Sequence, residues 1–76
     1  RFDLMLEPRD RQLPGIIMEF KAVPSKNKAK LTEVAKEAIS QIETRHYATE
    51  LEDRNVKSII KYGIAFSGKN AVVEMR

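Results

Sequence analysis

Apolar and polar residues alternate over residues 2–7, at the start of the chain. A period of two predicts a β-strand with one buried face. Residues 8–15 contain two prolines and a glycine among polar residues, which is typical of a turn. Residues 16–23 are more continuously apolar, so they predict a second and more buried strand. We expect the two strands to form an antiparallel hairpin.

The middle of the chain follows a helical pattern from about Ala29 to Asp53. Its apolar residues recur at intervals of three and four: Leu31, Val34, Ala35, Ala38, Ile39 and Ile42. This spacing predicts an amphipathic helix. Ser25 or Asn27 would serve as its N-cap. The apolar stripe is less regular further on, so we predict a bend between Thr44 and Tyr47.

Two more strands are predicted near the end of the chain. Residues 56–66 are rich in β-branched and aromatic side chains, and residues 71–75 would return antiparallel to them after a turn. A strand, a helix and a strand in succession make the second and third strands parallel, with a right-handed connection. The expected fold is α/β with mixed α+β character, in which a ββαββ sheet packs against one long helix.

Composition limits the classes of function. The chain has 76 residues, so we treat residues 1–76 as a single domain. It has no cysteine and one histidine, His46, which excludes thiolate sites and sites of several histidines. No apolar run approaches the roughly 20 residues of a membrane helix, and no signal peptide is evident. These features favour a cytoplasmic protein with no membrane partner. The net charge of +3 is compatible with a nucleic-acid partner.

Three ionisable residues of the predicted hairpin could act together. Glu19 and Lys21 lie two positions apart on one strand, so their side chains share a face. A register that pairs Asp3 with Glu19 would oppose two carboxylates, which destabilises a sheet unless a cation is present. A hard divalent ion such as Mg²⁺ suits these ligands, with the backbone carbonyl of Phe20 as a further oxygen. Lys21 would then stabilise charge on a phosphoryl oxygen or help to position the attacking water.

A simpler explanation of these residues stays open. A Glu-x-Lys sequence on a strand is most often a solvated ion pair, and an aspartate near the start of a strand is usually a surface residue. Residue chemistry alone therefore predicts candidate metal carboxylates and no more.

The segments Arg1–Pro8 and Gly15–Lys21 resemble the PD-(D/E)XK nuclease superfamily. Residues 35–47 and 61–69 resemble one bacterial branch, whose members usually carry this domain C-terminal to an AAA-ATPase-like domain. The resemblance implies a restriction-endonuclease-like core. It also implies a DNA nuclease that hydrolyses phosphodiester bonds with Mg²⁺ or Mn²⁺.

The resemblance assigns roles residue by residue. It implies that Asp3 is the first metal-binding acid, Glu19 the (D/E) and Lys21 the K of the motif. Gln41 matches a glutamine that the branch often has on the following helix, and it would support catalysis. Tyr47 matches a tyrosine of the branch, although core packing with its hydroxyl at the surface is the simpler role.

The chain also departs from the family pattern. The superfamily core has the order αβββαβ, whereas no leading helix or first strand is found here, and Phe2 stands where a proline usually precedes the first acid. We therefore expect a fragment of the domain, with an ATPase-like domain upstream in the intact protein. A strand left at the sheet edge would favour a homodimer or a strand swap.

The alternative functions are a non-catalytic accessory domain that binds a partner or nucleic acid, and a purely structural unit.

Overall fold

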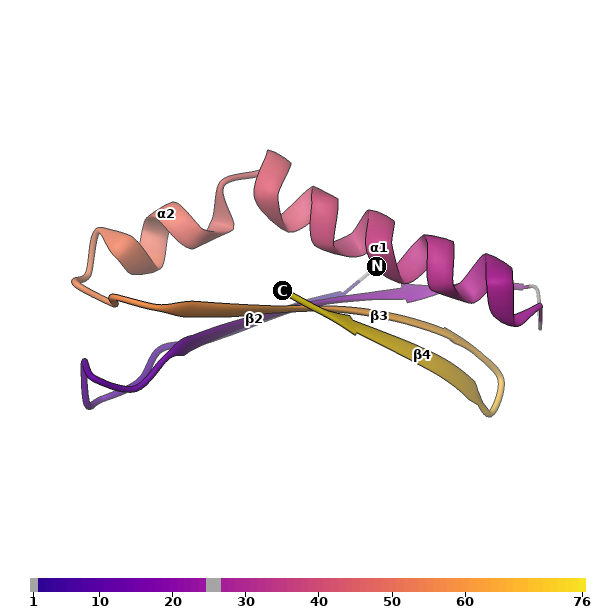
Figure 1. The fold of residues 1–76 in the computed structure, drawn as a ribbon, viewed down its shortest axis with the longest axis horizontal. Coiled ribbons are helices and arrows are strands. Elements are labelled where there is room, and N and C mark those ends of the chain that lie inside the picture. The colour runs from indigo at the N-terminus through magenta and orange to yellow at the C-terminus, as the bar shows by residue number, and fades with distance from the viewer. Residues whose placement is uncertain (1, 25–26) are drawn as a thin grey trace.

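The computed structural model describes residues 2–24 and 27–76, which form one sheet and two helices on the same side of it (Figure 1). The elements in chain order are β1 (Phe2–Leu6), β2 (Gly15–Ala22), α1 (Lys28–Thr44), α2 (Tyr47–Glu52), β3 (Ile59–Ser67) and β4 (Asn70–Met75). The sheet order is β1-β2-β3-β4, with only the β2–β3 pair parallel. The predicted mixed sheet and ββαββ order are therefore confirmed. Neither helix of the described chain is long and apolar enough to cross a membrane.

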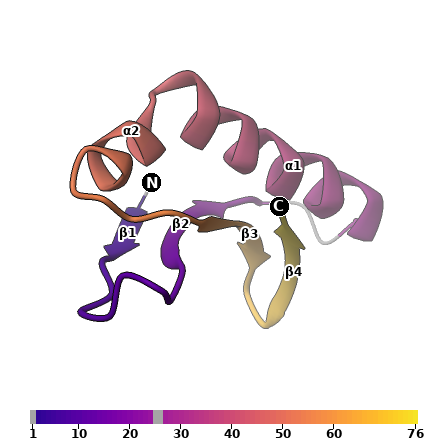
Figure 2. The same ribbon diagram turned by 60° about the vertical axis from the view of Figure 1, so that its left-hand side comes forward.

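The predicted helix is interrupted after Thr44. The chain ends α1 at Arg45 and adopts a left-handed conformation at His46, with φ of 57°. The bend expected in this region is thus confirmed, but it is a full break between two helices instead of a curve in one. Figure 1 shows α1 rising away from the sheet toward its C-terminal end, so a straight continuation would leave the sheet. After the break, α2 comes down toward the sheet on the side of β1 and β2 (Figure 2).

Local chemistry explains where α1 begins. The side chain of Asn27 accepts hydrogen bonds from the backbone amides of Ala29 and Lys30, at 2.9 and 3.3 Å. An asparagine in this position satisfies amides that have no partner within the helix. Asn27 is therefore the N-cap, and the alternative cap, Ser25, lies outside the described residues.

The predicted apolar stripe of α1 is buried against the sheet in two clusters. One cluster joins the end of α1 to α2 and β2, and its buried members are Ile17, Ile42, Leu51 and Val56. The other lies at the start of α1 over β3, and its buried members are Leu31, Val34, Ala35 and Ala65. Val56, predicted as the first residue of a strand, is instead a buried residue of the loop before β3. Its amide donates to the carbonyl of Leu51, so the turn that closes α2 occupies this part of the chain.

Gly63 sets the distance between α1 and the sheet. A Cβ added at this position would lie 2.0 Å from the backbone oxygen of Ala35 and 2.8 Å from Ile39. Only a residue without a side chain allows the helix to approach β3 this closely. The approach fixes the height of α1 above the sheet, and with it the position of the helix end.

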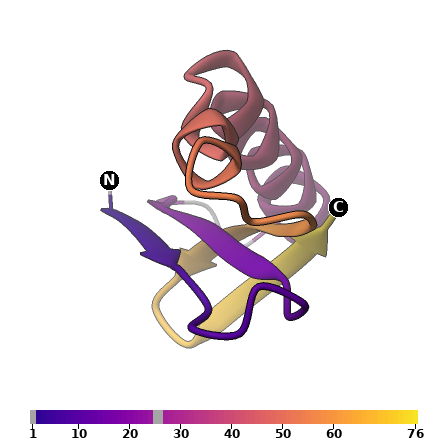
Figure 3. The ribbon, with the colours of Figure 1, turned by 90° about the vertical axis from the view of Figure 1, so that its left-hand side faces the viewer.

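The two faces of the sheet differ in an unusual way. The charged strand residues Asp3, Glu19, Lys21, Lys61 and Glu74 lie on the face that carries the helices, as the register of the strands shows. The opposite face is apolar or aromatic throughout, with Leu4, Leu6, Ile16, Met18, Phe20, Ile60, Tyr62, Ile64, Phe66, Val73 and Met75. No described helix or strand covers this face (Figure 3). Contiguous apolar patches of this kind usually mark a contact surface.

Glu7 ties the end of β1 to the end of α2. Its carboxylate accepts hydrogen bonds from Arg11 in the hairpin loop and from Arg54, both at 2.8 Å. Arg54 also lies 3.4 Å from Glu50 of α2. The hydrogen bond from Arg11, followed by that from Arg54, lowers the pKa of Glu7 below its usual value. These contacts hold β1 in place at the end remote from Asp3.

Replacing Gly63 with alanine should destabilise the protein. The new methyl group would meet the backbone of α1, which cannot move without lifting the helix from the core. We expect the free energy of unfolding to fall by about 1–3 kcal/mol, the range for overpacked cores. Chemical denaturation measures the change. Gly68→Asn is the control, because Gly68 has open space around it and asparagine tolerates its positive φ. Equal stability of Gly63→Ala and wild type would contradict the close approach.

The contribution of Glu7 to stability should depend on pH. Its pKa is lower in the folded protein than its ordinary value of 4.5, so the stabilisation is complete above that value and is lost as pH falls through the folded pKa. Glu7→Gln should therefore lower the melting temperature at pH 7 by a few degrees at most, because the pair is exposed. The difference from wild type should shrink below pH 4.5. Glu33→Gln, which removes a long 3.9 Å pair with Lys30, should change little. A difference independent of pH would rule out the ion pairs as its cause.

Candidate functional site

Asp3 and Glu19 lie directly opposite each other on adjacent strands. The β1–β2 register pairs these two residues, and it pairs Met5 with Ile17. The register considered in the sequence analysis, which opposes Asp3 and Glu19, is thus the one that the structure has. Side chains opposed in an antiparallel pair lie on the same face, with Cβ atoms roughly 4.5–5.5 Å apart. Both carboxylates therefore belong to the helix-bearing face of the sheet, below the break between α1 and α2.

Glu19 is buried completely, with 0% of its side chain exposed. Its Oε1 lies 3.7 Å from Nη1 of Arg45, the residue at which α1 ends. A buried carboxylate is costly unless a cation or hydrogen bonds compensate for lost hydration. Arg45 supplies positive charge from the helix layer.

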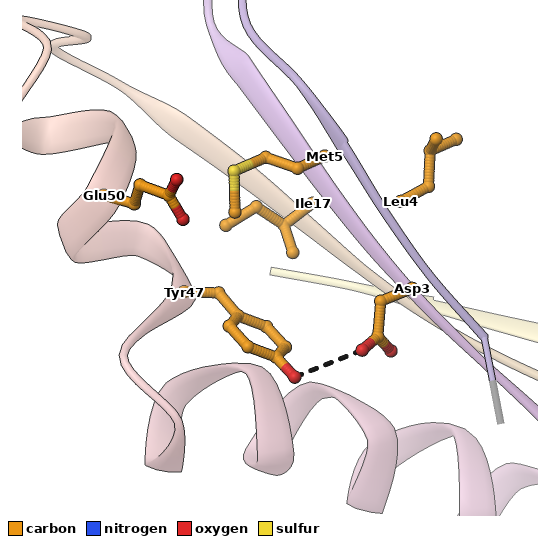
Figure 4. A pocket seen from close by; sticks show the side chains of 6 residues that line it. All are labelled: Asp3, Leu4, Met5, Ile17, Tyr47 and Glu50. Atoms are coloured by element: carbon orange, nitrogen blue, oxygen red, sulfur yellow. Dashed lines mark hydrogen bonds between the residues drawn. The ribbon is translucent and has the colours of Figure 1, made fainter.

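Tyr47 connects Arg45 to the second carboxylate. The hydroxyl of Tyr47 donates a hydrogen bond of 3.1 Å to Oδ2 of Asp3 (Figure 4), and Nη1 of Arg45 donates to the same hydroxyl at 3.4 Å. The ring itself packs beside the core cluster that contains Ile17. Tyr47 thus combines the predicted packing role with a polar contact to a candidate site residue.

Lys21 follows Glu19 on the same face of β2, nearer the end of the strand. Its side chain is partly exposed, and it pairs with Ala65 of β3 in the parallel register. Phe20 lies between the two, so its side chain belongs to the opposite, apolar face while its backbone runs beside the carboxylates. That its carbonyl binds a metal stays a prediction.

Gln41 lies one helical turn before Arg45 on α1. Residues four apart occupy the same side of a helix, and the backbone carbonyl of Gln41 accepts from the amide of Arg45. The side-chain Oε1 of Gln41 is buried, and it has no hydrogen-bond partner among the described residues. Buried amide oxygens without a partner are rare and call for an explanation, such as a ligand or water.

Sequence reasoning did not single out Arg45 or Glu50. Arg45 has one sequence signal, which is its position four residues after Gln41. Glu50 lines the same pocket as Asp3, and no sequence feature links it to the hairpin. His46 is exposed and occupies the left-handed position between the helices.

A pocket of about 200 Å³ opens beside Asp3. Its lining residues are Asp3, Leu4, Met5, Ile17, Tyr47 and Glu50 (Figure 4). Pockets that enclose a small organic molecule usually measure roughly 300–1,000 Å³. The space therefore fits an ion with its water molecules, or one group of a longer ligand that extends along the surface.

Comparison with models of known protein families identifies the family of the chain. A family model described as the PD-(D/E)XK nuclease superfamily matches residues 1–76. The chain belongs to the PD-(D/E)XK nuclease superfamily. A search of curated proteins and a search of solved structures found no match. The family match agrees with the restriction-endonuclease-like character of the mixed sheet with its helices.

Members of the PD-(D/E)XK superfamily typically use divalent metal ions. Within residues 2–24 and 27–76, no group of three or more histidine, cysteine, aspartate or glutamate side chains is placed to hold a metal. Asp3 and Glu19 are the two carboxylates that the register brings together. Mg²⁺ commonly binds one or two carboxylates and keeps several waters. This donor set therefore fits a hard divalent cation.

Proposed function

We propose that this protein is a metal-dependent phosphodiesterase that cleaves DNA. The observation that carries the proposal is the direct opposition of Asp3 and Glu19 on the helix-bearing face of the sheet. Two carboxylates in that position are unfavourable unless positive charge accompanies them. Membership of a nuclease superfamily supplies the class of chemistry, and the residues of this chain supply the candidate site.

The proposal gives each residue a separate task. Asp3 and Glu19 would hold Mg²⁺ or Mn²⁺, with the carbonyl of Phe20 as a third protein ligand. A divalent ion bound there would lower the pKa of a water and polarise the phosphoryl group. Lys21, on the same face as Glu19, would place its ammonium where negative charge grows on the phosphoryl oxygens. Gln41 would use its buried amide oxygen to orient a water or a ligand.

The partner implied by this chemistry is nucleic acid. The net positive charge of the chain would help to attract it. The net charge is +3, and Lys57 and Lys69 are exposed outside the site. Phosphate contacts from such residues provide affinity that falls with salt concentration. We further propose that an ATPase-like domain accompanies this unit in the intact protein.

A non-catalytic accessory role is the second candidate. The observation that favours it is the contact that Arg45 and Tyr47 already make with the two carboxylates. In that case the network would be a structural element and would bind no metal. The two functions differ in a measurable property, which is the affinity for divalent cations.

Substitution of Lys21 by alanine should reduce cleavage of supercoiled plasmid DNA. The variant would lose the positive charge that stabilises the transition state, so we expect the rate in Mg²⁺ or Mn²⁺ to fall about 100-fold or more. Lys69→Ala is the matched control, because it removes the same charge from an exposed turn. It should change the rate little. Equal rates for Lys21→Ala and wild type would rule out the proposed role.

Divalent cations should raise the melting temperature of the wild-type protein. A ligand that binds only the folded state stabilises it, and at ten times its Kd the rise would be about 5–10 °C for a chain of this size. The double variant Asp3→Asn, Glu19→Gln should show no rise, whereas Glu37→Gln on the exposed side of α1 should behave as wild type. No rise with millimolar Mn²⁺ in the wild type would favour the accessory role.

A further inference from the structure

Arg45 occupies a defined position at the end of α1. Its backbone amide donates to the carbonyls of Gln41 and Glu43, and the left-handed residue His46 follows it. The start of its side chain is therefore held by the helix end. From there the guanidinium group reaches Glu19 at 3.7 Å and Tyr47 at 3.4 Å.

These contacts connect Arg45 to both carboxylates of the candidate site. The contact with Glu19 is an ion pair, and the hydroxyl of Tyr47 links the guanidinium to Asp3. A guanidinium so placed offsets the charge of a carboxylate that is fully buried. The positive charge that the opposed carboxylates require is thus available from within the chain.

A divalent cation at Asp3 and Glu19 would bind the same two carboxylate groups. Mg²⁺ binds carboxylate oxygens directly, at roughly 2.0–2.1 Å. A guanidinium held beside the same carboxylate would repel the ion, because like charges repel and the repulsion is screened least next to the buried Glu19. Arg45 and a divalent ion therefore cannot both make their full electrostatic interaction with Glu19.

Arg45 can leave the site without becoming a buried, uncompensated charge. Its side chain is 36% exposed, in contrast to the 0% exposure of Glu19. A cation at the C-terminus of a helix also keeps a favourable interaction with the helix dipole. The guanidinium can therefore move into water while the backbone of α1 stays in place.

We propose that Arg45 is a built-in counter-ion that competes with the divalent metal for Glu19. This inference rests on the proposed metal site. In the metal-free protein, Arg45 offsets the carboxylate charge and keeps the hairpin and helix end together. Binding of the metal requires that the guanidinium withdraw, so Arg45 sets the metal concentration at which the site is filled.

Arg45→Gln should bind Mn²⁺ more tightly than wild type. We expect its Kd, measured by isothermal titration calorimetry, to be about three- to tenfold lower, because the variant lacks the half-buried Arg45–Glu19 ion pair that competes with the metal. The metal-free variant should melt at a lower temperature than wild type. Arg76→Gln is the matched control, because it removes the same charge from an ion pair with Glu43 at 2.7 Å. Its Kd should stay within twofold of wild type.

A second measurement uses the wild-type protein and does not depend on folding of the variant. Saturation with Mn²⁺ should increase the rate at which phenylglyoxal modifies Arg45, as mapped by mass spectrometry. The modification rate of Arg76 serves as the internal reference.

The outcomes separate this inference from the proposed function. If the wild type binds Mn²⁺ but Arg45→Gln has an unchanged or higher Kd, competition by Arg45 is wrong and the metal site stands. A constant modification rate of Arg45 leads to the same conclusion. If neither protein binds Mn²⁺, the metal site and the inference both fail. An equal gain in affinity for Arg76→Gln would show a general charge effect and overturn the specific role of Arg45.

Discussion

Two carboxylates face each other across β1 and β2, and the rest of the structure near them depends on how their charge is offset. Glu19 is fully buried and Asp3 lies opposite it. Such an arrangement is unfavourable in a sheet without a cation or hydrogen-bond donors nearby. Arg45 and Tyr47 meet this requirement from the helix layer. The break between α1 and α2 matters for this reason, since it brings these two residues over the hairpin.

The position of the break follows from packing elsewhere. Gly63 lets α1 lie against β3, and the apolar stripe of α1 fixes its rotation. The end of the helix then falls above β2, and His46 turns the chain so that Leu51 reaches the second cluster. A site made of polar side chains is thus held by apolar contacts on both sides of it. Rigid support of this kind is what a group of functional side chains requires to keep its geometry.

The charged side chains of the sheet lie on the helix-bearing face, beside apolar core residues such as Ile17 and Ala65, and the other face is apolar. A small protein usually places its charged strand residues on the face toward water. Glu19 is fully buried on the helix-bearing face, which strengthens the electrostatic interactions of its carboxylate. The other face exposes large apolar side chains such as Leu6, Val73 and Met75, and an exposed apolar face of this kind favours association.

Local patterns in the sequence determined much of this protein. Alternation and helical spacing predicted four strands and the helical region. Because side chains on a strand repeat every two residues, the pattern is compatible with Asp3 and Glu19 on one face, whereas their direct pairing was one supposed register that the structure has. The family resemblance singled out Lys21 and Gln41, whose roles stay predictions. The tertiary structure alone decided that Arg45 meets Glu19 and that Tyr47 meets Asp3, since these pairs are separated by long stretches of chain. Such contacts depend on the height and rotation of α1 and on the left-handed turn at His46, which no local period encodes.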